Sequence, residues 1–289
     1  MIEVIKPGIY SSVQDQGRFG YAVLGVPPSG ALDGISFRLA NAVLGNNSDD
    51  AALEITFGGA EFKFTVDTSI AITGGDYTAS LNDCNVPMNQ RIPVAKHDVL
   101  RFGPRKTGVR TYLGIQGGIL TEKMMGSRSF YPSITPEFRI NRGTFIPIHS
   151  LENNRISIDK SIENTLLNQV CSTDFDQSIP LELKAYVGPE HSLLHPLERK
   201  NLTGVFTVGR NDRMGYLLQE SVPNQIPPIH TSSALPGTVQ LTPAGQLIIL
   251  MNDGQVTGGY PRIFQLDETA KDMLSQCAQG QKIKFVPIT

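Results

Sequence analysis

Several kinds of residue are scarce or absent. The 289 residues include no tryptophan, 7% aromatic residues and 18% charged residues, and the net charge is −2. The three cysteines, Cys84, Cys171 and Cys277, are widely spaced and odd in number, which argues against a disulfide framework and against paired zinc ligands. A nearly neutral chain lacks the long-range attraction that draws proteins to nucleic acid or anionic lipid. We therefore expect neither nucleic acid nor a membrane as a partner.

Long hydrophobic runs are missing as well. The N-terminal residues MIEVIKPGIY contain a carboxylate at Glu3 and no apolar run of signal-peptide length. The longest strongly apolar run, residues 247–251, is far shorter than the roughly 20 residues that span a bilayer. These features predict a cytoplasmic protein.

Familiar catalytic motifs are also absent. No segment matches GxxxxGK[ST] or GxGxxG, so ATP, if it is used, would bind mostly elsewhere. There is no CxxC, HExxH or GxSxG. His191 and His195 have the spacing of two metal ligands on a helix, but Pro196 follows and no third ligand is evident. Two solvated imidazoles in a surface turn are the favoured alternative, and no metal is predicted.

Glycine and proline, in contrast, are abundant. The 28 Gly and 19 Pro make up about 16% of the chain, above the roughly 12% of average usage, which indicates many turns. Between the turns lie alternating or continuous apolar segments, as expected for β-strands. They are residues 53–57, 61–66, 69–73, 98–102, 110–115, 183–187, 238–241, 246–251 and 282–286. In the second segment Phe62, Phe64 and Val66 share one face, which we expect to be core.

Two helices are predicted among these strands. Apolar residues recur four apart after Asp33, which can cap the helix, and Gly45 can end it. A second helix is expected to begin at Asp267 and to close at Gly280, with Cys277 as a core thiol on its apolar stripe. So few helices make a βαβ repeat hard to draw and favour a sandwich or barrel.

A short internal match indicates how the chain could be divided. The segment RFGY at residues 18–21 resembles RMGY at residues 213–216, and chance or a duplicated barrel with a re-used motif would explain it. A duplication would divide the chain between residues 150 and 182, where the polar stretch 152–177 is the best linker candidate. We expect two lobes, residues 1–150 and 183–289, with an irregular connection; the alternative is an insertion within one domain.

Four segments combine glycine with polar side chains, namely residues 11–33, 126–128, 211–215 and 252–261. In the last, a strand would deliver Asp253 and Gln255 to a rim, while Gly258 and Gly259 permit positive φ and close approach to a ligand. An acid and an amide suit an amide or urea-like group, because Asp accepts N–H bonds and Gln both accepts and donates. The alternative, which spacing alone favours, is a turn in which Asp253 caps its own loop.

Arginines in the other segments suit anions. Arg18, Arg128 and Arg213 could bind a carboxylate or a carboxybiotin-like anion, or form buried pairs with the neighbouring Asp15 and Asp212. We favour the structural pair for Arg18 and Arg213. Arg128 has no adjacent acid, so anion binding is more open there.

Five motifs in a fixed order make the chain recognisable. They are SSVQDQGRFGYAVLGVPPSGALD at residues 11–33, GSRS at 126–129, NDRMG at 211–215, PGTVQ at 236–240 and DGQVTGGYP at 253–261. Together they resemble the biotin-dependent carboxyltransferase family, also called allophanate hydrolase subunit 2. Its members include the C subunit of ATP-dependent 5-oxoprolinase, a Kip-type antagonist of a histidine-kinase inhibitor, and one half of the carboxyltransferase part of urea carboxylase.

The resemblance implies a mainly β fold of cyclophilin-like β-barrels over residues 1–289, and a separate partner chain of the B-subunit type. It also implies the residues at the substrate cavity. Those expected to be catalytic are Asp253 and Gln255, and those expected to bind substrate are Thr257, Gly258, Gly259, Tyr260, Ser29 and Asp33. Arg128 is added to the substrate-binding residues because it has no adjacent acid. The chain has neither an amidase signature nor a biotin-carrier AMKM motif, so biotin would arrive on another protein.

The leading hypothesis is the C subunit of a cytoplasmic 5-oxoprolinase, a component of a hydrolase that is not active alone. With the A and B subunits it would open the lactam of 5-oxoproline to glutamate at the expense of ATP. One alternative is a carboxyltransferase half that moves CO2 from carboxybiotin to urea or a similar amide. Another is a regulatory protein that sequesters a kinase inhibitor without catalysis.

Overall fold

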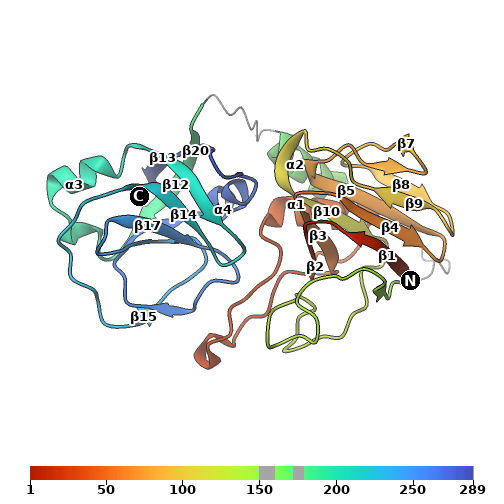
Figure 1. Cartoon of the computed structure of the whole chain (residues 1–289), viewed down its shortest axis with the longest axis horizontal. Helices are drawn as coiled ribbons and strands as arrows, with labels where there is room; N and C mark the ends of the chain where they lie inside the picture. Colours follow the sequence, from red (N-terminus) through yellow and green to blue (C-terminus); the bar gives the residue numbers. More distant parts are fainter. Residues whose placement is uncertain (150–159, 172–178, 289) are drawn as a thin grey trace. The chain divides into compact units, whose positions relative to one another are not determined.

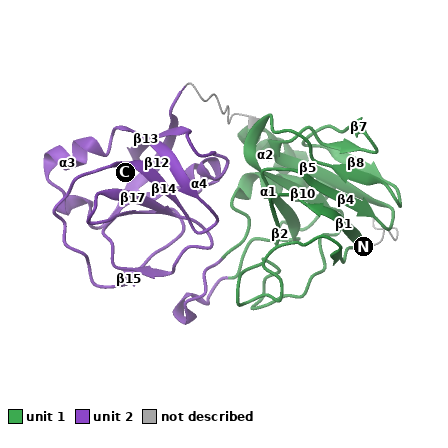
Figure 2. Cartoon of the chain, viewed as in Figure 1, with its two compact units in different colours: residues 1–18, 29–174 green, residues 19–28, 175–289 purple. Residues whose placement is uncertain are grey.

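The computed structural model describes residues 1–149, 160–171 and 179–288. The chain divides into two compact units, unit 1 with residues 1–18 and 29–174 and unit 2 with residues 19–28 and 175–289 (Figure 2). Each consists mainly of β-strands, and the described residues contain four α-helices (Figure 1). The prediction of a mainly β fold with few helices is confirmed. None of the helices in the described ranges is long and apolar enough to cross a membrane.

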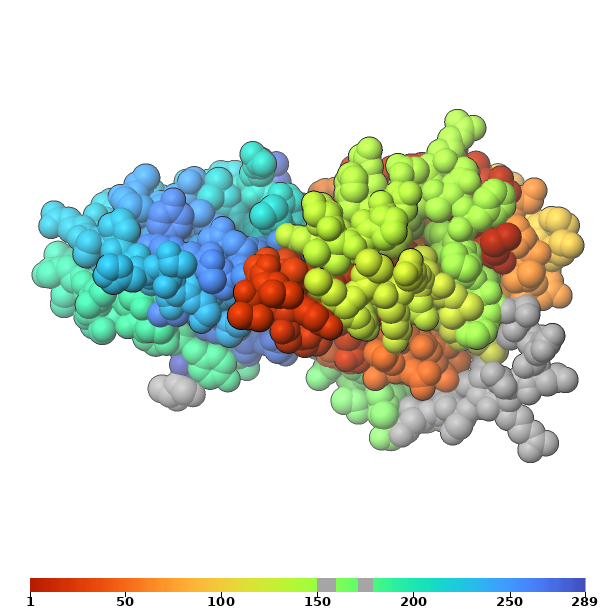
Figure 3. All heavy atoms as spheres, turned by 90° about the horizontal axis from the view of Figure 1, so that it is seen from below, coloured from red at the N-terminus to blue at the C-terminus, as the bar shows by residue number. Residues whose placement is uncertain are grey.

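Unit 1 contains two open sheets whose neighbouring strands are all antiparallel. The first has the order β11 (Phe145–Ile146), β1 (Ile2–Pro7), β4 (Ala60–Phe64), β9 (Val99–Arg101), β6 (Ser80–Leu81) and β7 (Cys84–Asn85). The second has the order β2 (Tyr10–Gln14), β3 (Ala52–Thr56), β10 (Thr107–Ile115), β5 (Thr68–Asp76) and β8 (Arg91–Val94). Between β10 and β11, residues 116–144 contain no helix or strand and spread over the face of unit 1 in Figure 3.

The main core of unit 1 joins the two sheets. Phe62 and Phe64 of the first sheet are fully buried in one cluster with Ile70 and Ile72 of the second, as their alternation predicted, while Val66 is only partly buried. Since successive side chains of a strand point to opposite faces, the residue between the two isoleucines, Ala71, packs instead against helix α1.

Helix α1, Gly34–Leu44, confirms the prediction made from its two ends. The Asp33 carboxylate accepts a hydrogen bond from the main-chain N–H of Ser36 at 2.9 Å, which satisfies one of the free donors of the first turn. Gly45 ends the helix with φ of 67°, a conformation that costs glycine little. The apolar side of α1 packs on the second sheet of unit 1.

Helix α2, Lys160–Cys171, corrects the prediction of irregular chain over residues 152–177. Among its described side chains only Leu166 is buried, and Leu167 and Val170 pack beside it against α1. With so few apolar residues on one face, the helical periodicity of hydrophobic residues is weak in this part of the sequence. The other residues of the proposed linker, 152–159 and 172–177, lie outside the described residues.

Unit 2 contains a closed barrel of seven strands. Their order is β12 (Leu181–Val187), β19 (Arg262–Leu266), β16 (Thr238–Leu241), β17 (Gln246–Leu250), β14 (Gly215–Ser221), β13 (Val205–Asn211) and β20 (Lys282–Ile288). The barrel closes where β20 pairs with β12 in parallel, whereas the other pairs are antiparallel. Phe264 and Phe285 fill its interior with ring centroids 5.2 Å apart.

Helix α4, Glu268–Ser275, packs against β12 and β19. Its cap is Asp267, as predicted, but the helix ends at Ser275 and not near Gly280. Cys277 is fully buried, which confirms its place in the core. The smaller elements are helix α3 (Pro196–Asn201), the 3₁₀ turns Ala22–Leu24 and His191–Leu193, and the two-stranded sheet of β15 (Ser232–Ser233) and β18 (Thr257–Gly258).

All nine predicted strands overlap observed ones, namely β3, β4, β5, β9, β10, β12, β16, β17 and β20. The internal sequence match, however, does not correspond to a structural repeat. After Arg18 the chain runs through Tyr21 into a 3₁₀ turn, whereas after Arg213 it enters β14, where Tyr216 is fully buried.

Candidate functional site

The polar loop of residues 252–260 follows strand β17 in unit 2, and an ion pair anchors its beginning. Asp253 is buried, and Nε and Nη2 of Arg213 donate to its Oδ2 and Oδ1 at 2.7 and 3.1 Å. The main-chain N–H of Asp253 also donates to the carbonyl of Arg213 at 3.0 Å. The prediction that Arg213 pairs with Asp212 is therefore wrong, since Asp212 accepts from the main-chain N–H of Met214 within its own turn.

Beyond Asp253 the loop presents polar side chains to solvent. Gln255, Thr257 and Tyr260 are exposed. Gln255 makes one long hydrogen bond, from its Nε2 to Oε1 of Gln240 at 3.5 Å. The ion pair thus fixes the start of the loop and leaves an amide and two hydroxyl groups available to a ligand.

Gly258 and Gly259 differ from their prediction, because neither adopts a positive φ. Gly258 is instead required by a close approach. A Cβ atom there would lie 2.7 Å from Nε2 of Gln240 and 2.9 Å from Nε2 of Gln255, whereas a Cβ atom on Gly259 would meet only the carbonyl of Ile229 at 3.3 Å. A side chain at position 258 would therefore clash with both amide groups.

Gln240 contacts this loop through Gln255. It lies in the motif of residues 236–240, for which no functional role was predicted. It is 1% exposed on β16, where it is flanked by Ile248 of β17 and Arg262 of β19. The sequence offered one sign that Gln240 is unusual, namely a glutamine within an otherwise apolar part of a predicted strand.

In unit 1 the first two polar motifs form one hydrogen-bond network around Asp15. Its Oδ1 accepts from the Ser127 and Ser129 hydroxyls at 2.6 Å and from Gly17 N–H at 2.8 Å, and its Oδ2 accepts from Arg128 N–H at 2.6 Å. These neutral donors satisfy a buried carboxylate that has no counter-ion among the described residues.

Arg18, predicted to pair with Asp15, donates elsewhere. Its Nη1 donates to Oγ of Ser29 at 3.0 Å, and its Nη2 donates to the carbonyl of Ser129. Ser29, a predicted substrate-binding residue, is therefore a buried acceptor in this network. The guanidinium of Arg128 forms no hydrogen bond or ion pair with the described residues and remains available to an anion.

Asp33, another predicted substrate-binding residue, is occupied as the cap of α1. Besides the main-chain N–H, the Ser36 hydroxyl donates to its Oδ2 at 2.6 Å. Its own N–H donates to the hydroxyl of Tyr112, which donates to Oε2 of Glu54 at 2.7 Å. Burial, with the nearby Glu54 carboxylate, raises the pKa of Tyr112 well above its usual value, so Tyr112 stays a neutral donor.

The two histidines also have structural roles. His195 caps α3, where its Nδ1 accepts from the N–H of Leu197 at 3.3 Å. The His191 ring lies 5.4 Å from that of Phe264, and burial, with the charge of Arg199, lowers the pKa of His191. Within the described ranges no three side chains are grouped as metal ligands.

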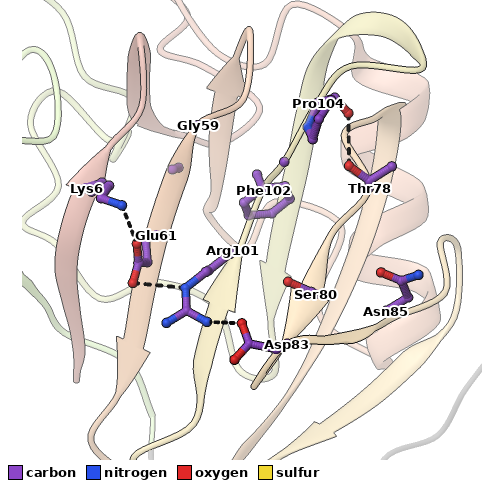
Figure 4. A pocket seen from close by; sticks show the side chains of 12 residues that line it. Lys6, Gly59, Glu61, Thr78, Ser80, Asp83, Asn85, Arg101, Phe102 and Pro104 are labelled. Atoms are coloured by element: carbon purple, nitrogen blue, oxygen red, sulfur yellow. Dashed lines mark hydrogen bonds and ion pairs between the residues drawn. The ribbon is translucent and has the colours of Figure 1, made fainter.

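A groove of about 490 Å³ lies on the first sheet of unit 1. Its charged side chains are linked by consecutive ion pairs (Figure 4). Lys6 pairs with Glu61 at 2.9 Å, Glu61 with Arg101 at 3.2 Å, and Arg101 with Asp83 at 2.6 Å. The hydrogen bond from Lys6 is the main cause that lowers the pKa of Glu61. Two cations and two anions balance, so a charged ligand would have to break existing pairs, and the loop of unit 2 is the better candidate site.

The fold is mainly β, and the loop of residues 252–260 is its candidate functional site. The model of the carboxyltransferase domain, subdomains A and B, matches residues 24–287. The chain belongs to this family, as its five motifs predicted.

Three relatives show how the similarity is distributed. The 5-oxoprolinase C subunit of Escherichia coli (strain K12) is 32% identical over 293 residues, which cover 99% of this chain and 91% of that protein. The urea amidolyase of Lachancea kluyveri is 46% identical over 130 residues, 45% of this chain and 7% of that protein. The crystal structure of the K. lactis urea amidolyase matches with a TM-score of 0.87 and 28% identity, covering 100% of this chain and 19% of that one.

Proposed function

We propose that this chain is the C subunit of an ATP-dependent 5-oxoprolinase, which acts with separate A and B subunits to hydrolyse 5-oxoproline to glutamate. The similarity to the E. coli C subunit supports the proposal because it extends over nearly the full length of both proteins. The A and B subunits are then its partners. ATP would bind mainly to a partner, since this chain has no P-loop.

The loop of residues 252–260 has the chemistry that a lactam requires. The N–H and C=O groups of 5-oxoproline need one acceptor and one donor, and an exposed glutamine amide supplies both. Gln255 and the hydroxyls of Thr257 and Tyr260 are exposed beside each other in sequence, while the pair of Asp253 with Arg213 holds the loop in place. In unit 1, the guanidinium of Arg128 suits a carboxylate.

The decisive experiment compares three purified subunits with two. The A and B subunits together with this chain should form glutamate from 5-oxoproline and ATP, whereas full turnover without this chain would refute the proposal. Gln255→Met should lower kcat/KM about tenfold, as expected for the loss of one useful hydrogen bond. Gln219→Met, at an exposed glutamine of β14, is the matched control and should not change kcat/KM.

The similarity to urea amidolyase supports a second candidate, a carboxyltransferase half that moves CO2 from carboxybiotin to urea or a similar amide. This function predicts that the chain, with its partner subunit, is retained on a biotinylated carrier protein and carboxylates urea. Failure to bind the carrier, together with turnover of 5-oxoproline, would exclude it.

A further inference from the structure

An arginine–carboxylate pair also lies at the far end of the loop of residues 252–260. Nε and Nη2 of Arg262, the first residue of β19, donate to Oε2 and Oε1 of Glu190 at 3.0 and 2.8 Å. The main-chain N–H of Arg262 donates to the same Oε2 at 2.9 Å. Charge-assisted bonds of this bidentate kind are stronger than neutral ones and fix the orientation of the guanidinium. The loop thus ends beside a fixed arginine, as it begins beside Arg213.

Glu190 is itself held against β19. The main-chain N–H of Gly188 donates to the carbonyl of Ile263 at 2.8 Å, and a Cβ atom on Gly188 would overlap the carbonyl of Arg262. A glycine at position 188 therefore allows the turn that carries Glu190 to approach β19 closely. The side chains of Arg262 and Glu190 are 21% and 13% exposed, so salt screens this pair less than it screens a fully exposed one.

The remaining amino group of Arg262 reaches a second strand. Its Nη1 donates to Oγ of Ser232 at 2.9 Å and to the carbonyl of Ser233 at 3.2 Å. These two serines form β15, which pairs with β18 of the loop. In this pairing Ser232 lies opposite Gly258, and Ser233 lies opposite Thr257. One guanidinium therefore joins Glu190 to the strand on which the second half of the loop rests.

This strand pair determines where the loop presents its side chains. Two main-chain hydrogen bonds extend the pairing, from the N–H of Ala234 to the carbonyl of Val256 at 2.9 Å and from the N–H of Ile229 to the carbonyl of Gly259 at 3.0 Å. Successive side chains of a strand point to opposite faces. A slip of the pairing by one residue would therefore reverse the direction of the Thr257 side chain.

We propose that Arg262 and Glu190 are positioning residues of the loop, which hold Thr257 in place through β15 and thereby set the affinity for the small amide or lactam substrate. This inference rests on the proposed function and adds two residues that act on the site without touching the substrate. A loop that is already fixed at both ends loses little conformational freedom when a ligand binds. Ordering the backbone of one further residue on binding would weaken the affinity about tenfold.

Steady-state kinetics of the complete complex of this chain with the A and B subunits test the proposal. Arg262→Lys keeps a cation beside Glu190 but lacks the planar fork that also reaches β15. It should therefore raise KM for 5-oxoproline about tenfold. Ser232→Ala removes only the hydroxyl that Arg262 contacts and should raise KM about threefold. A KM within about twofold of wild type in both variants would overturn the proposal.

Glu220 of β14 provides a matched control elsewhere in unit 2. Its two carboxylate oxygens accept from the N–H and the hydroxyl of Thr207 on β13, at 2.5 and 2.6 Å. Glu220→Gln should lower the melting temperature about as much as Glu190→Gln does, because each change weakens a carboxylate that accepts several hydrogen bonds. Of the two variants, only Glu190→Gln should raise KM. An equal rise in KM in Glu220→Gln would assign the effect to lost stability and refute the positioning role.

Hydrogen exchange separates this inference from the proposed function. If the wild-type complex does not turn over 5-oxoproline, the proposed function fails, and the pairing of β15 with β18 is then tested directly in the same complex. Arg262→Lys should accelerate exchange in residues 229–234 and 256–259 and not in residues 205–211 of β13. Unchanged exchange in the first two segments would show that Arg262 does not position the loop, whatever the complex catalyses.

Discussion

Two buried aspartates, one in each unit, are stabilised in opposite ways. Asp15 in unit 1 is held by neutral hydroxyl and N–H donors from residues 17 and 127–129, so its carboxylate ties two distant segments together. Asp253 in unit 2 is held by a bidentate arginine, Arg213, at the start of its loop. In the first arrangement every hydrogen bond from the described residues to the carboxylate joins residues 15–17 to residues 127–129 or lies within the first of these segments. The second fixes one end of a loop whose later residues Gln255, Thr257 and Tyr260 are exposed.

The largest effect is expected at the ion pair of unit 2. Arg213→Met would leave the Asp253 carboxylate buried without its cation and should lower the free energy of unfolding by about 3–5 kcal/mol. Guanidinium chloride denaturation with hydrogen exchange resolved by peptide would place the loss in unit 2. The double variant Arg213→Met/Asp253→Leu should regain most of this loss. If the single variant loses less than about 1 kcal/mol, the pair does not hold the loop.

A smaller loss is expected at the neutral network of unit 1. Asp15→Asn replaces one acceptor oxygen by an NH2 group that faces a donor, which should cost about 2 kcal/mol. Hydrogen exchange should accelerate in residues 11–18 and 126–130 and not in unit 2. Asp83→Asn, at a surface ion pair in the same unit, is the control and should leave exchange unchanged. Equal exchange in Asp15→Asn and wild type would show that Asp15 does not organise these segments.

The next smaller effect is expected at the ion pair of Glu190 with Arg262 in unit 2, and it should depend on pH. Hydrogen bonds from Arg262, at 2.8 and 3.0 Å, lower the pKa of Glu190 below its usual 4.5. The stabilisation by the ionised group is therefore complete above pH 4.5 and is lost as the pH falls through the lowered value. Glu190→Gln should be less stable than wild type at pH 7, and the gap should narrow as the pH falls below 4.5. A gap that widens in acid would contradict this assignment.

The smallest effect is expected at the cap of α1. Asp33→Ala should cost about 1 kcal/mol, since the N–H of Ser36 loses its acceptor. Asp33→Asn should restore most of it, because asparagine caps as well as aspartate. Thermal denaturation of the two variants measures this difference. Failure of asparagine to restore stability would show that the charge of Asp33, and not the cap, is what matters.

Local signals in the sequence predicted most of the fold. Alternation identified strands such as β4 and β16, and Asp33 with Gly45 marked both ends of α1, because these features depend on neighbouring residues. Strands interrupted by a breaker escaped notice, as β8 did with Pro93 and β13 with Gly209. Helix α2 was missed because its stability depends on contact with α1.

The site was harder to predict than the fold. Adjacent acids were the expected partners of Arg18 and Arg213, yet Arg213 pairs with Asp253, forty residues along the chain. The contact between Gln240 and Gln255 depends on the register of β16 against its two neighbours, which no local pattern encodes. Motif resemblance found the loop, and only the three-dimensional arrangement separated its anchor from its exposed groups.

The parallel pairing of β12 with β20 also has a consequence during synthesis. All described strands of unit 1 have been made when the ribosome reaches residue 146, whereas the barrel of unit 2 stays open until β20 has emerged at residue 288. Until then β12 and β13 present unpaired edges that favour association with other chains. The later unit, which carries the proposed site, is thus the one most in need of protection as the polypeptide is produced.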